Sequence, residues 1–308
     1  MRVLVTGANG FVGRSTVNAL ALRGHHAIRA VRQVQPNAMI VGNVDANTDW
    51  TEALRGCDAV IHLAARVHQM RDGSTNPLNE FRRINTSGTL RLAEQAKAAG
   101  VRRFIFLSSV KVNGEESPKP YRSSDTPNPQ DHYARSKQEA EEGLRHLSTG
   151  ADMDLVVIRP PLVYGPGVRA NFQSMMRLLH RGIPLPLARV TDNRRSLVAL
   201  DNLVDLLITC LDHPAAANQT FLVSDGEDLS TADLLRRLGQ AMGHPARLLP
   251  VPTGLLWAGA RLLGKGDMAQ RLMGSLQVNI DHTRDTLGWA PPVSVDEGLR
   301  RAAEGFQP

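Results

Sequence analysis

Tyr133 and Lys137 are the pair of side chains whose types and spacing most clearly suggest chemistry. They lie four residues apart in a segment of helical pattern, so both side chains would lie on one face of a helix. A free phenol has a pKa near 10 and transfers protons poorly at neutral pH. A nearby ammonium would stabilise the phenolate and lower that pKa. Such pairs also occur by chance on protein surfaces, but the context of this one predicts an acid–base function.

Two serines, Ser108 and Ser109, follow the apolar segment Arg103–Leu107, which predicts a buried strand. In open α/β sheets, ligands bind beyond the carboxyl ends of the parallel strands, where these serines would lie. A serine hydroxyl in that place can hydrogen-bond the same substrate oxygen as the phenol. Because the helix that carries Tyr133 follows this strand, we expect the serines and Tyr133 to form one site.

Three glycines, Gly7, Gly10 and Gly13, separate an apolar run at 2–6 from a segment with helical spacing at 11–23. The first permits a tight turn, the second lets a phosphate approach the backbone, and the third lets the helix and the strand pack closely. The N–H groups and the dipole at the start of the helix attract anions. An ordinary turn can contain such glycines, but their position directly after the first strand predicts a dinucleotide-binding site.

The end of the second predicted strand, at about 26–31, bears on the choice between NAD and NADP. NAD-binding proteins place an acidic residue about 20 positions after the glycines to bind the ribose 2′-hydroxyl. No acid precedes Asp45 in this chain, whereas Arg14 and Arg32 could pair with a 2′-phosphate. We therefore predict NADP, with NAD as the alternative. Both arginines could also be ordinary surface charges.

Short apolar segments alternate with helical ones through the first half of the chain. Strands are expected at 2–6, 26–31, 38–41, 58–63, 103–107 and 155–158, and helices at 11–23, 79–99 and 131–147. This alternation predicts an α/β fold with a doubly wound parallel sheet of the Rossmann type. After Pro160, prolines and glycines become frequent, and 196–212 suggests one more strand and helix. We expect a dinucleotide-binding domain at 1–162, rejoined by 193–214, and a smaller C-terminal α/β substrate-binding region at 163–192 and 215–308.

Composition and charge narrow the class of protein. The chain has 308 residues, 42% hydrophobic and 21% charged, so it can bury a large core. The net charge of +6 would suit an anionic ligand, but only 4% of residues are aromatic and no block of like charges occurs, so we expect no nucleic-acid partner. No apolar run approaches the ~18 residues that span a bilayer, so we expect no membrane insertion. Cys57 and Cys210 lack metal-ligand spacing, so we expect no metal and a cytoplasmic location.

Further motifs join the glycines, the serines and the Tyr133–Lys137 pair in one known pattern. They are His62–Ala65, Asn85–Thr89, Arg159–Gly167, Asn193–Asp201 and Leu287–Trp289. The whole set resembles the extended short-chain dehydrogenase/reductase family, and the last three motifs resemble its nucleotide-sugar branch. The similarity covers nearly the whole chain, and the combination of motifs is highly specific.

This resemblance implies roles for individual residues. Ser109, Tyr133 and Lys137 would be the catalytic residues. The cofactor would contact Gly7, Gly10, Phe11, Val12, Gly13, Arg14, Arg32, Asn43, Val44, Ala64, Ala65, Asn85, Tyr133, Lys137 and Pro160. The nucleotide-sugar substrate would contact Ser108, Ser109, Asn171 and Arg195. Asn85 could equally be structural, and Arg195 could be a surface charge, although a diphosphate needs a fixed cation with planar donors. The resemblance also implies a homodimer formed through the helices at 79–99 and 131–147.

The serine motif bears on the reaction. The sugar 4,6-dehydratases of this branch carry Thr-Asp-Glu where this chain has Ser109, Val110 and Lys111, so a dehydratase is not expected. A C4-ketoreductase consumes reduced cofactor at each turnover, whereas a C4-epimerase regenerates its cofactor in place. The acid-free second strand favours NADPH, and so a reductase. The run Ser108–Glu115 also resembles reductase-type proteins of surface-polysaccharide biosynthesis, which implies a UDP-linked 4-keto-6-deoxy N-acetyl sugar as the substrate. A UDP-glucose or UDP-N-acetylglucosamine 4-epimerase is the alternative, and a non-catalytic NADP-binding sensor is a third possibility.

Overall fold

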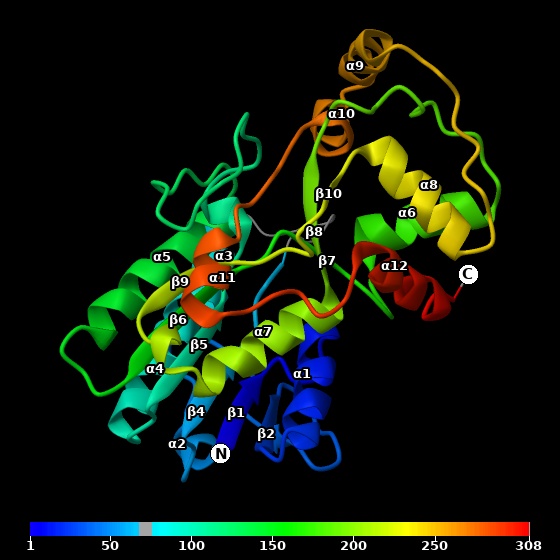
Figure 1. The fold of residues 1–308 in the computed structure, drawn as a ribbon. Helices are drawn as coiled ribbons and strands as arrows, with labels where there is room; N and C mark the ends of the chain where they lie inside the picture. Colours follow the sequence, from blue (N-terminus) through cyan, green and yellow to red (C-terminus); the bar gives the residue numbers. More distant parts are fainter. Residues whose placement is uncertain (68–75, 308) are drawn as a thin grey trace.

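The computed structural model describes residues 1–67 and 76–307. Within these residues, a seven-stranded sheet has the order β3-β2-β1-β4-β5-β6-β9, and every neighbouring pair is parallel (Figure 1). Its strands are β1 (Arg2–Thr6), β2 (His26–Val31), β3 (Met39–Ile40), β4 (Ala59–His62), β5 (Arg103–Leu107), β6 (Asp154–Arg159) and β9 (Gln219–Leu222). This order, which reverses at β1, is that of doubly wound dinucleotide-binding folds, so the predicted fold class is confirmed.

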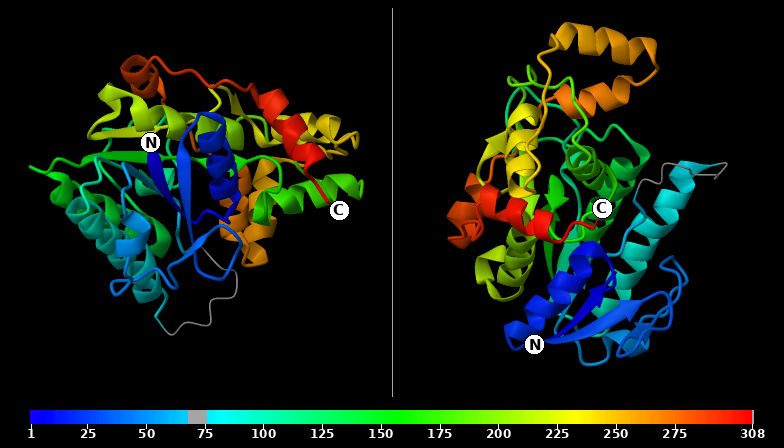
Figure 2. Two further views of the ribbon diagram at one scale, coloured as in Figure 1. Left: turned by 90° about the horizontal axis from the view of Figure 1, so that it is seen from below. Right: turned by 90° about the vertical axis from the view of Figure 1, so that its right-hand side faces the viewer.

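Helices cover both faces of this sheet (Figures 1 and 2). One face carries α1 (Phe11–Leu22) and α7 (Leu200–Asp212), and the side chains of Val3 and Val5 point into that core. The opposite face carries α2 (Thr51–Leu54), α4 (Gly88–Ala98) and α5 (His132–Ser148), and Leu4 points there. The strands are buried on both sides, which explains why their sequences are almost continuously apolar.

The helix predicted at 79–99 is divided in the structure. It begins as α3 (Pro77–Phe81), passes through a π-helical turn at Arg82–Ser87 and continues as α4. A π-helical turn widens a helix by one residue and is often found at functional sites. Here it lies beside the Tyr133–Lys137 face of α5.

One strand lies in a different sheet from the one expected. β8 (Arg195–Ala199) does not rejoin the large sheet but pairs with β7 (Leu162–Tyr164) and β10 (Asp228–Leu229) in a second, three-stranded sheet. The seventh strand of the large sheet is β9, which pairs with β6. Of the segment 193–214, only α7 returns to the large sheet. Both strands are short and apolar, so their pattern could not assign them to one sheet or the other.

The three-stranded sheet carries a core of its own. Around it pack α6 (Ala170–His180), α8 (Thr231–Ala241) and α12 (Val295–Glu304), which bury Phe172, Leu235 and Leu299. The remaining helices are α9 (Thr253–Leu262), α10 (Gly266–Met273) and α11 (Asp281–Leu287). In Figure 1, α9 and α10 lie at the end of the molecule opposite the N-terminus.

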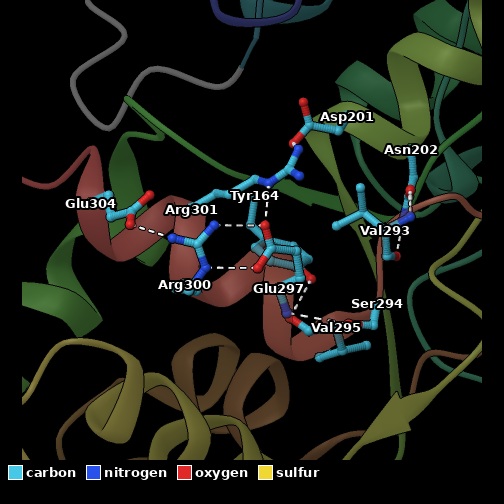
Figure 3. A network of polar contacts seen from close by, with 10 residues as sticks. All are labelled: Tyr164, Asp201, Asn202, Val293, Ser294, Val295, Glu297, Arg300, Arg301 and Glu304. Carbon is cyan, nitrogen blue, oxygen red and sulfur yellow. Dashed lines mark hydrogen bonds and ion pairs between the residues drawn. The ribbon is translucent and has the colours of Figure 1, made fainter.

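A buried carboxylate joins the two sheets. Asp225 accepts hydrogen bonds from the backbone N–H of Ala199 and the side chain of Asn202, both at 2.7 Å, and from the hydroxyl of Tyr164 at 2.8 Å. Asn202 also exchanges two hydrogen bonds of 2.8 Å with the backbone of Val293, just before α12 (Figure 3). The start of α7 is therefore attached to β7 and to the chain that enters α12.

Close packing of α1 on the glycine turn requires glycine at position 13. A Cβ there would lie 2.1 Å from the carbonyl oxygen of Gly7 and 2.8 Å from the Cα of Ala8. Gly7 itself has a φ of +63°, in the left-handed region that favours glycine. The turn between β1 and α1 thus depends on the absence of two side chains.

We predict that Gly13→Ala lowers the free energy of unfolding by about 1–3 kcal/mol, because α1 must move away from the turn. Gly259→Ala is the matched control. It lies within α9, where a Cβ meets no atom within 4 Å, and it should raise stability by up to about 1 kcal/mol. Urea unfolding followed by circular dichroism measures both changes. A Gly13→Ala variant as stable as the wild type would contradict the packing argument.

Candidate active site

The glycine turn opens the site at the carboxyl edge of the large sheet. Gly10 is the N-cap of α1; no side chain among the described residues caps it, and the first turn of α1 has no acidic residue. The first N–H groups of α1 and the positive end of its dipole can therefore serve an anion. A Cβ at Gly10 would lie 3.1 Å from the carbonyl oxygen of Gly7. The free N–H groups at the start of α1 and the closely packed glycine backbone beside them fit the diphosphate of a dinucleotide.

The structure brings Tyr133 and Ser109 together. Tyr133 is the second residue of α5, whose N-cap residue Asp131 accepts a 2.7 Å hydrogen bond from the N–H of Ala134. Ser109 follows β5, and its side chain lies close enough to the phenol of Tyr133 to lower the pKa of that phenol. The end of a strand and the start of a helix thus place two hydroxyl groups side by side at the sheet edge.

Lys137 lies one turn after Tyr133, and only 1% of its surface is exposed. Its ammonium donates a 2.8 Å hydrogen bond to the carbonyl oxygen of Leu107, the last residue of β5, and lies 4.4 Å from the ring centroid of Phe106. In the part of the chain that the structure describes, this carbonyl is its one hydrogen-bond acceptor, although the ammonium has three N–H groups. Ribose hydroxyls of a dinucleotide would supply acceptors of the kind that it lacks.

The electrostatics of the pair correct the sequence-based expectation. The pKa of Tyr133 is raised to about 12, because burial and the charge of Asp131 raise it by more than the nearby Ser109 hydroxyl lowers it. We expected Lys137 to lower this pKa. Its ammonium is itself desolvated, however, and burial lowers the pKa of Lys137 to about 7, with Glu141 opposing the shift. At neutral pH the protein's own groups therefore keep the phenol protonated, and burial disfavours the charged form of Lys137.

The side chain of Asn85 joins two segments beside the site through hydrogen bonds. It is fully buried in the π-helical turn; its side-chain oxygen accepts a 2.8 Å hydrogen bond from the N–H of Arg66, and its amide donates to the carbonyl of Arg66 and to the hydroxyl of Ser136, both at 3.0 Å. Ser136 in turn donates to the carbonyl oxygen of Tyr133 at 2.7 Å. Both ends of the amide thus bind protein groups, which agrees with the structural role rather than with a direct contact to the cofactor.

A buried histidine extends this network. The Nδ1 of His62 lies 2.7 Å from the hydroxyl of Thr6, and its Nε2 lies 2.9 Å from the hydroxyl of Thr89, which donates to the carbonyl of Asn85 at 2.7 Å. Burial and the charge of Lys137 lower the pKa of His62 to about 3, so the imidazole is neutral. His62 therefore joins β1, β4 and α4. The sequence showed it only as part of a motif.

An ion cluster beside Ser109 and Tyr133 was missed by the sequence analysis. The ammonium of Lys111 lies 2.6 Å from a carboxylate oxygen of Glu115 and 2.6 Å from one of Asp131. Burial lowers the pKa of Lys111, but its hydrogen bonds to the two carboxylates outweigh burial and raise it overall. Lys111 thus offsets part of the charge of Asp131, the carboxylate that raises the pKa of Tyr133. The opposite charges four residues apart, at 111 and 115, were the available signal.

Ser108 does not join the hydroxyl pair. Its hydroxyl donates a 2.5 Å hydrogen bond to the buried carboxylate of Glu141, which also accepts hydrogen bonds of 2.6 and 2.9 Å from the guanidinium of Arg159. Successive side chains of an extended segment point to opposite sides. Ser109 therefore faces Tyr133, whereas Ser108, expected to contact the substrate, faces the core.

Arg195 and Asn171 are the other expected substrate residues, and no hydrogen bond between them is found within the described residues. The guanidinium of Arg195 donates a 3.0 Å hydrogen bond to the carbonyl of Gly274. Burial lowers the pKa of Arg195, and the nearby Glu116 and Glu115 oppose this shift. Among residues 1–67 and 76–307, Arg195 forms no ion pair, so a desolvated cation is available to an anion. Asn171 lies exposed in the first turn of α6, with no described hydrogen bond to Arg195.

The remaining expected cofactor residues lie in the first turn of α1 or follow the strands of the large sheet. They are Phe11, Val12 and Arg14 in α1, Arg32 after β2, Asn43 and Val44 after β3, Ala64 and Ala65 after β4, and Pro160 after β6. Arg14 and Arg32 are exposed, and neither has an ion pair within the described ranges. An exposed cation directly after β2 stands where a ribose 2′-substituent is bound in this fold.

Comparisons with known proteins agree with this architecture. The model of the NAD dependent epimerase/dehydratase family matches residues 3–224. The chain is 47% identical over 311 residues to a UDP-glucose 4-epimerase of Vibrio cholerae, covering 99% of this chain and 95% of that protein. It is also 27% identical over 332 residues to a 2-alkyl-3-oxoalkanoate reductase of Stenotrophomonas maltophilia, covering 98% of each.

A solved structure shows the same fold. The UDP-glucuronic acid 4-epimerase of Bacillus cereus in complex with NAD matches with a TM-score of 0.78 and 20% identity, covering 99% of this chain and 98% of that one. At this level of identity, the likeness is one of fold alone.

We predict that Glu141→Gln lowers the free energy of unfolding by about 3–5 kcal/mol, because it leaves Arg159 buried without its partner charge. Glu142→Gln is the matched control on the exposed side of α5 and should change stability by less than about 0.5 kcal/mol. Urea unfolding at neutral pH measures both.

The same substitution should change the pH dependence of stability. Burial raises the pKa of Glu141, but hydrogen bonds and charge from Arg159 outweigh burial and hold it below the usual 4.5. The resulting stability is present above pH 4.5 and is lost as the pH falls through the folded-state pKa. This acid-dependent loss should be smaller in Glu141→Gln than in the wild type. Parallel stability curves for the two proteins would contradict the assignment.

Proposed function

The chain belongs to the NAD dependent epimerase/dehydratase family, and from this premise we propose that it is an NAD-dependent 4-epimerase of a UDP-linked sugar. The similarity to a UDP-glucose 4-epimerase over nearly the whole of both chains supports the proposal. This support outweighs the preference for a reductase, which rests on the end of one strand and on the resemblance of the run Ser108–Glu115. The epimerase therefore becomes the first candidate.

The approach of the Ser109 hydroxyl to the phenol of Tyr133 at the carboxyl edge of the sheet, close enough to lower the pKa of that phenol, carries the proposal. A phenol and a hydroxyl that lie side by side in this way can exchange a proton with a sugar hydroxyl, as the oxidation of a secondary alcohol requires. Val110 and Lys111 stand where the dehydratases of the family carry two carboxylates. The site is therefore suited to oxidation and reduction at C4 rather than to elimination of water.

Each side chain has a separate task. Tyr133 takes the proton of the sugar 4-hydroxyl and later returns it, while Ser109 hydrogen-bonds the same oxygen. Lys137 binds the ribose hydroxyls of the cofactor. Bound NAD supplies the acceptor and donor of hydride for C4 and, when oxidised, a positive charge. Because burial raises the pKa of Tyr133 to about 12, an added positive charge is needed before Tyr133 can act as a base at neutral pH.

Arg195 would bind the diphosphate of the substrate. Its guanidinium is desolvated, forms no described ion pair within residues 1–67 and 76–307, and lies beside the loop that carries Glu115 and Glu116. A guanidinium offers planar paired donors to phosphate oxygens. Asn171, exposed at the start of α6, would contact the same nucleotide from the second region.

A 4-ketoreductase is the second candidate, and one observation favours it. Arg32 is exposed directly after β2, and no acidic residue precedes Asp45. An enzyme that binds NADPH and oxidises it at each turnover would use a cation in that place.

The test uses the purified protein with UDP-glucose or UDP-N-acetylglucosamine and no added cofactor. An epimerase converts each sugar to an equilibrium mixture with its C4 epimer and retains NAD through purification. Oxidation of added NADPH that depends on a UDP-4-keto sugar, without interconversion of epimers, would overturn the proposal in favour of the reductase. Dinucleotide binding with neither reaction would leave only the sensor.

Within the same assay, Tyr133→Phe should reduce kcat by at least about a hundredfold, the usual contribution of a positioned acid–base group, and leave NAD binding near the wild-type value. Tyr121→Phe is the matched control, because within the described part of the chain its hydroxyl bonds only to the carbonyl of Glu116. Normal turnover by Tyr133→Phe would exclude the assigned role.

Lys111 should set the pH at which Tyr133 acts. In Lys111→Met, the carboxylate of Asp131 is no longer neutralised, so its charge raises the pKa of Tyr133. The base form then requires a higher pH, and the acid limb of the kcat profile should move upward by up to about one pH unit. Lys119→Met, an exposed lysine nearby in the sequence, is the control. A downward shift would contradict the argument.

A further inference from the structure

Helices α9 and α10 form a pair at the end of the molecule farthest from the N-terminus (Figures 1 and 2). No residue of α9 is buried. Leu256 of α9 and Met273 of α10 pack against the core of the second region, so the pair is attached along one side. Its other side faces outward. Among the residues that the structure describes, no helix is both long and apolar enough to cross a bilayer.

The outward side of α9 is apolar. Leu255 is 65% exposed, Leu262 is 88% exposed and Leu263, just after the helix, is 72% exposed. Leu255, Ala258 and Leu262 lie three and four residues apart, so they form one stripe along the helix. Met268 of α10 adds a fourth large apolar side chain, 53% exposed. We call these four large side chains, Leu255, Leu262, Leu263 and Met268, the α9–α10 surface.

The segment that forms α9 and α10 is rich in basic residues. Between positions 253 and 273, the sequence has three basic residues, Arg261, Lys265 and Arg271, against one acidic residue, Asp267. The basic side chains are all exposed. A short helix with exposed leucines on one side and basic residues at the flanks is typical of helices that lie in the interface of an anionic membrane.

We propose that the α9–α10 surface binds the surface of an anionic lipid bilayer. The leucines enter the boundary between headgroups and acyl chains, and Arg261 and Lys265 contact the lipid phosphates. The protein would lie on the surface of the bilayer without crossing it. The proposal is therefore compatible with the sequence, which has no apolar run long enough to span a bilayer. A second copy of the chain suits this surface less well. Four side chains are few for the roughly 800 Å² per partner of a specific protein interface, and a symmetric contact would bring like charges together.

The position of the surface suggests what docking achieves. Gln270 of α10 donates a 3.2 Å hydrogen bond to the carboxylate of Glu116, and the carbonyl of Gly274, just after α10, accepts the hydrogen bond from Arg195. The helix α10 is thus attached to the segment that contains Arg195. Docking of the α9–α10 surface would therefore take place beside the segment that contributes the proposed diphosphate-binding residue.

The test is co-sedimentation of the full chain with vesicles. One vesicle population contains phosphatidylglycerol and phosphatidylethanolamine, and the other contains phosphatidylcholine alone. We expect binding to the anionic vesicles that weakens as salt is added, because the attraction of the basic residues is screened. The double variant Leu255→Asn/Leu262→Asn should reduce the bound fraction by roughly tenfold or more. In the double variant Arg261→Gln/Lys265→Gln, vesicle binding should lose most of its dependence on salt.

Leu22→Asn is the matched control. Leu22 is 87% exposed at the end of α1, far in sequence from the α9–α10 surface, and its substitution should leave vesicle binding unchanged. Circular dichroism and dinucleotide binding show that each variant is folded. The proposal is overturned by a wild type that does not sediment, by equal binding to both vesicle types, or by undiminished binding of the double leucine variant. It is also overturned if that variant changes the mass of the protein in solution, which would assign the surface to a second copy.

Discussion

The ammonium of Lys137, held 2.8 Å from the last carbonyl of β5, determines where chemistry can occur in this protein. It fixes α5 to the sheet edge one turn from Tyr133, and Glu141, one turn further on, bonds to Arg159 at the end of β6. Because the three α5 residues are four positions apart, they share one face of the helix. A movement of α5 that displaced the phenol would therefore also break a buried lysine contact and a buried ion pair, which is costly. The position of Tyr133 is therefore fixed, because it shares one face of α5 with Lys137 and Glu141, which bind the ends of β5 and β6.

Burial disfavours the charged forms of both members of the Tyr133–Lys137 pair. It raises the pKa of the phenol to about 12 and lowers that of the ammonium to about 7, so the protein alone does not stabilise a phenolate–ammonium pair at neutral pH. A positive charge added to such a poorly solvated site acts strongly, because little water screens it. The oxidised form of a nicotinamide cofactor carries that charge and the reduced form does not. The cofactor state that can accept hydride is thus also the state that favours deprotonation of the sugar hydroxyl.

Local pattern predicted much of the fold and less of the site. The glycine turn and six of the seven strands of the large sheet are recognisable because each depends on neighbouring residues, such as Gly7 and Gly13; β9 was not predicted. The sheet to which β8 belongs depends on partners far along the chain, which a short apolar run does not reveal. Ser108 and Ser109 could not be told apart by type, because only the direction of the backbone decides which hydroxyl meets Tyr133. The direction of the Tyr133 pKa shift depends on burial and on Asp131, and neither could be read from the i, i+4 spacing.

The two ends of the site are connected through one short loop. Lys111 pairs with Asp131 beside the phenol and with Glu115, while Glu115 and Glu116 both act on the guanidinium of Arg195. Glu115 is therefore shared, because it pairs with Lys111 and also attracts the guanidinium of Arg195. Lys111 in turn contacts Asp131, whose charge raises the pKa of Tyr133. A substitution at Glu115 must therefore be interpreted as a change to the electrostatic field at both Arg195 and Tyr133.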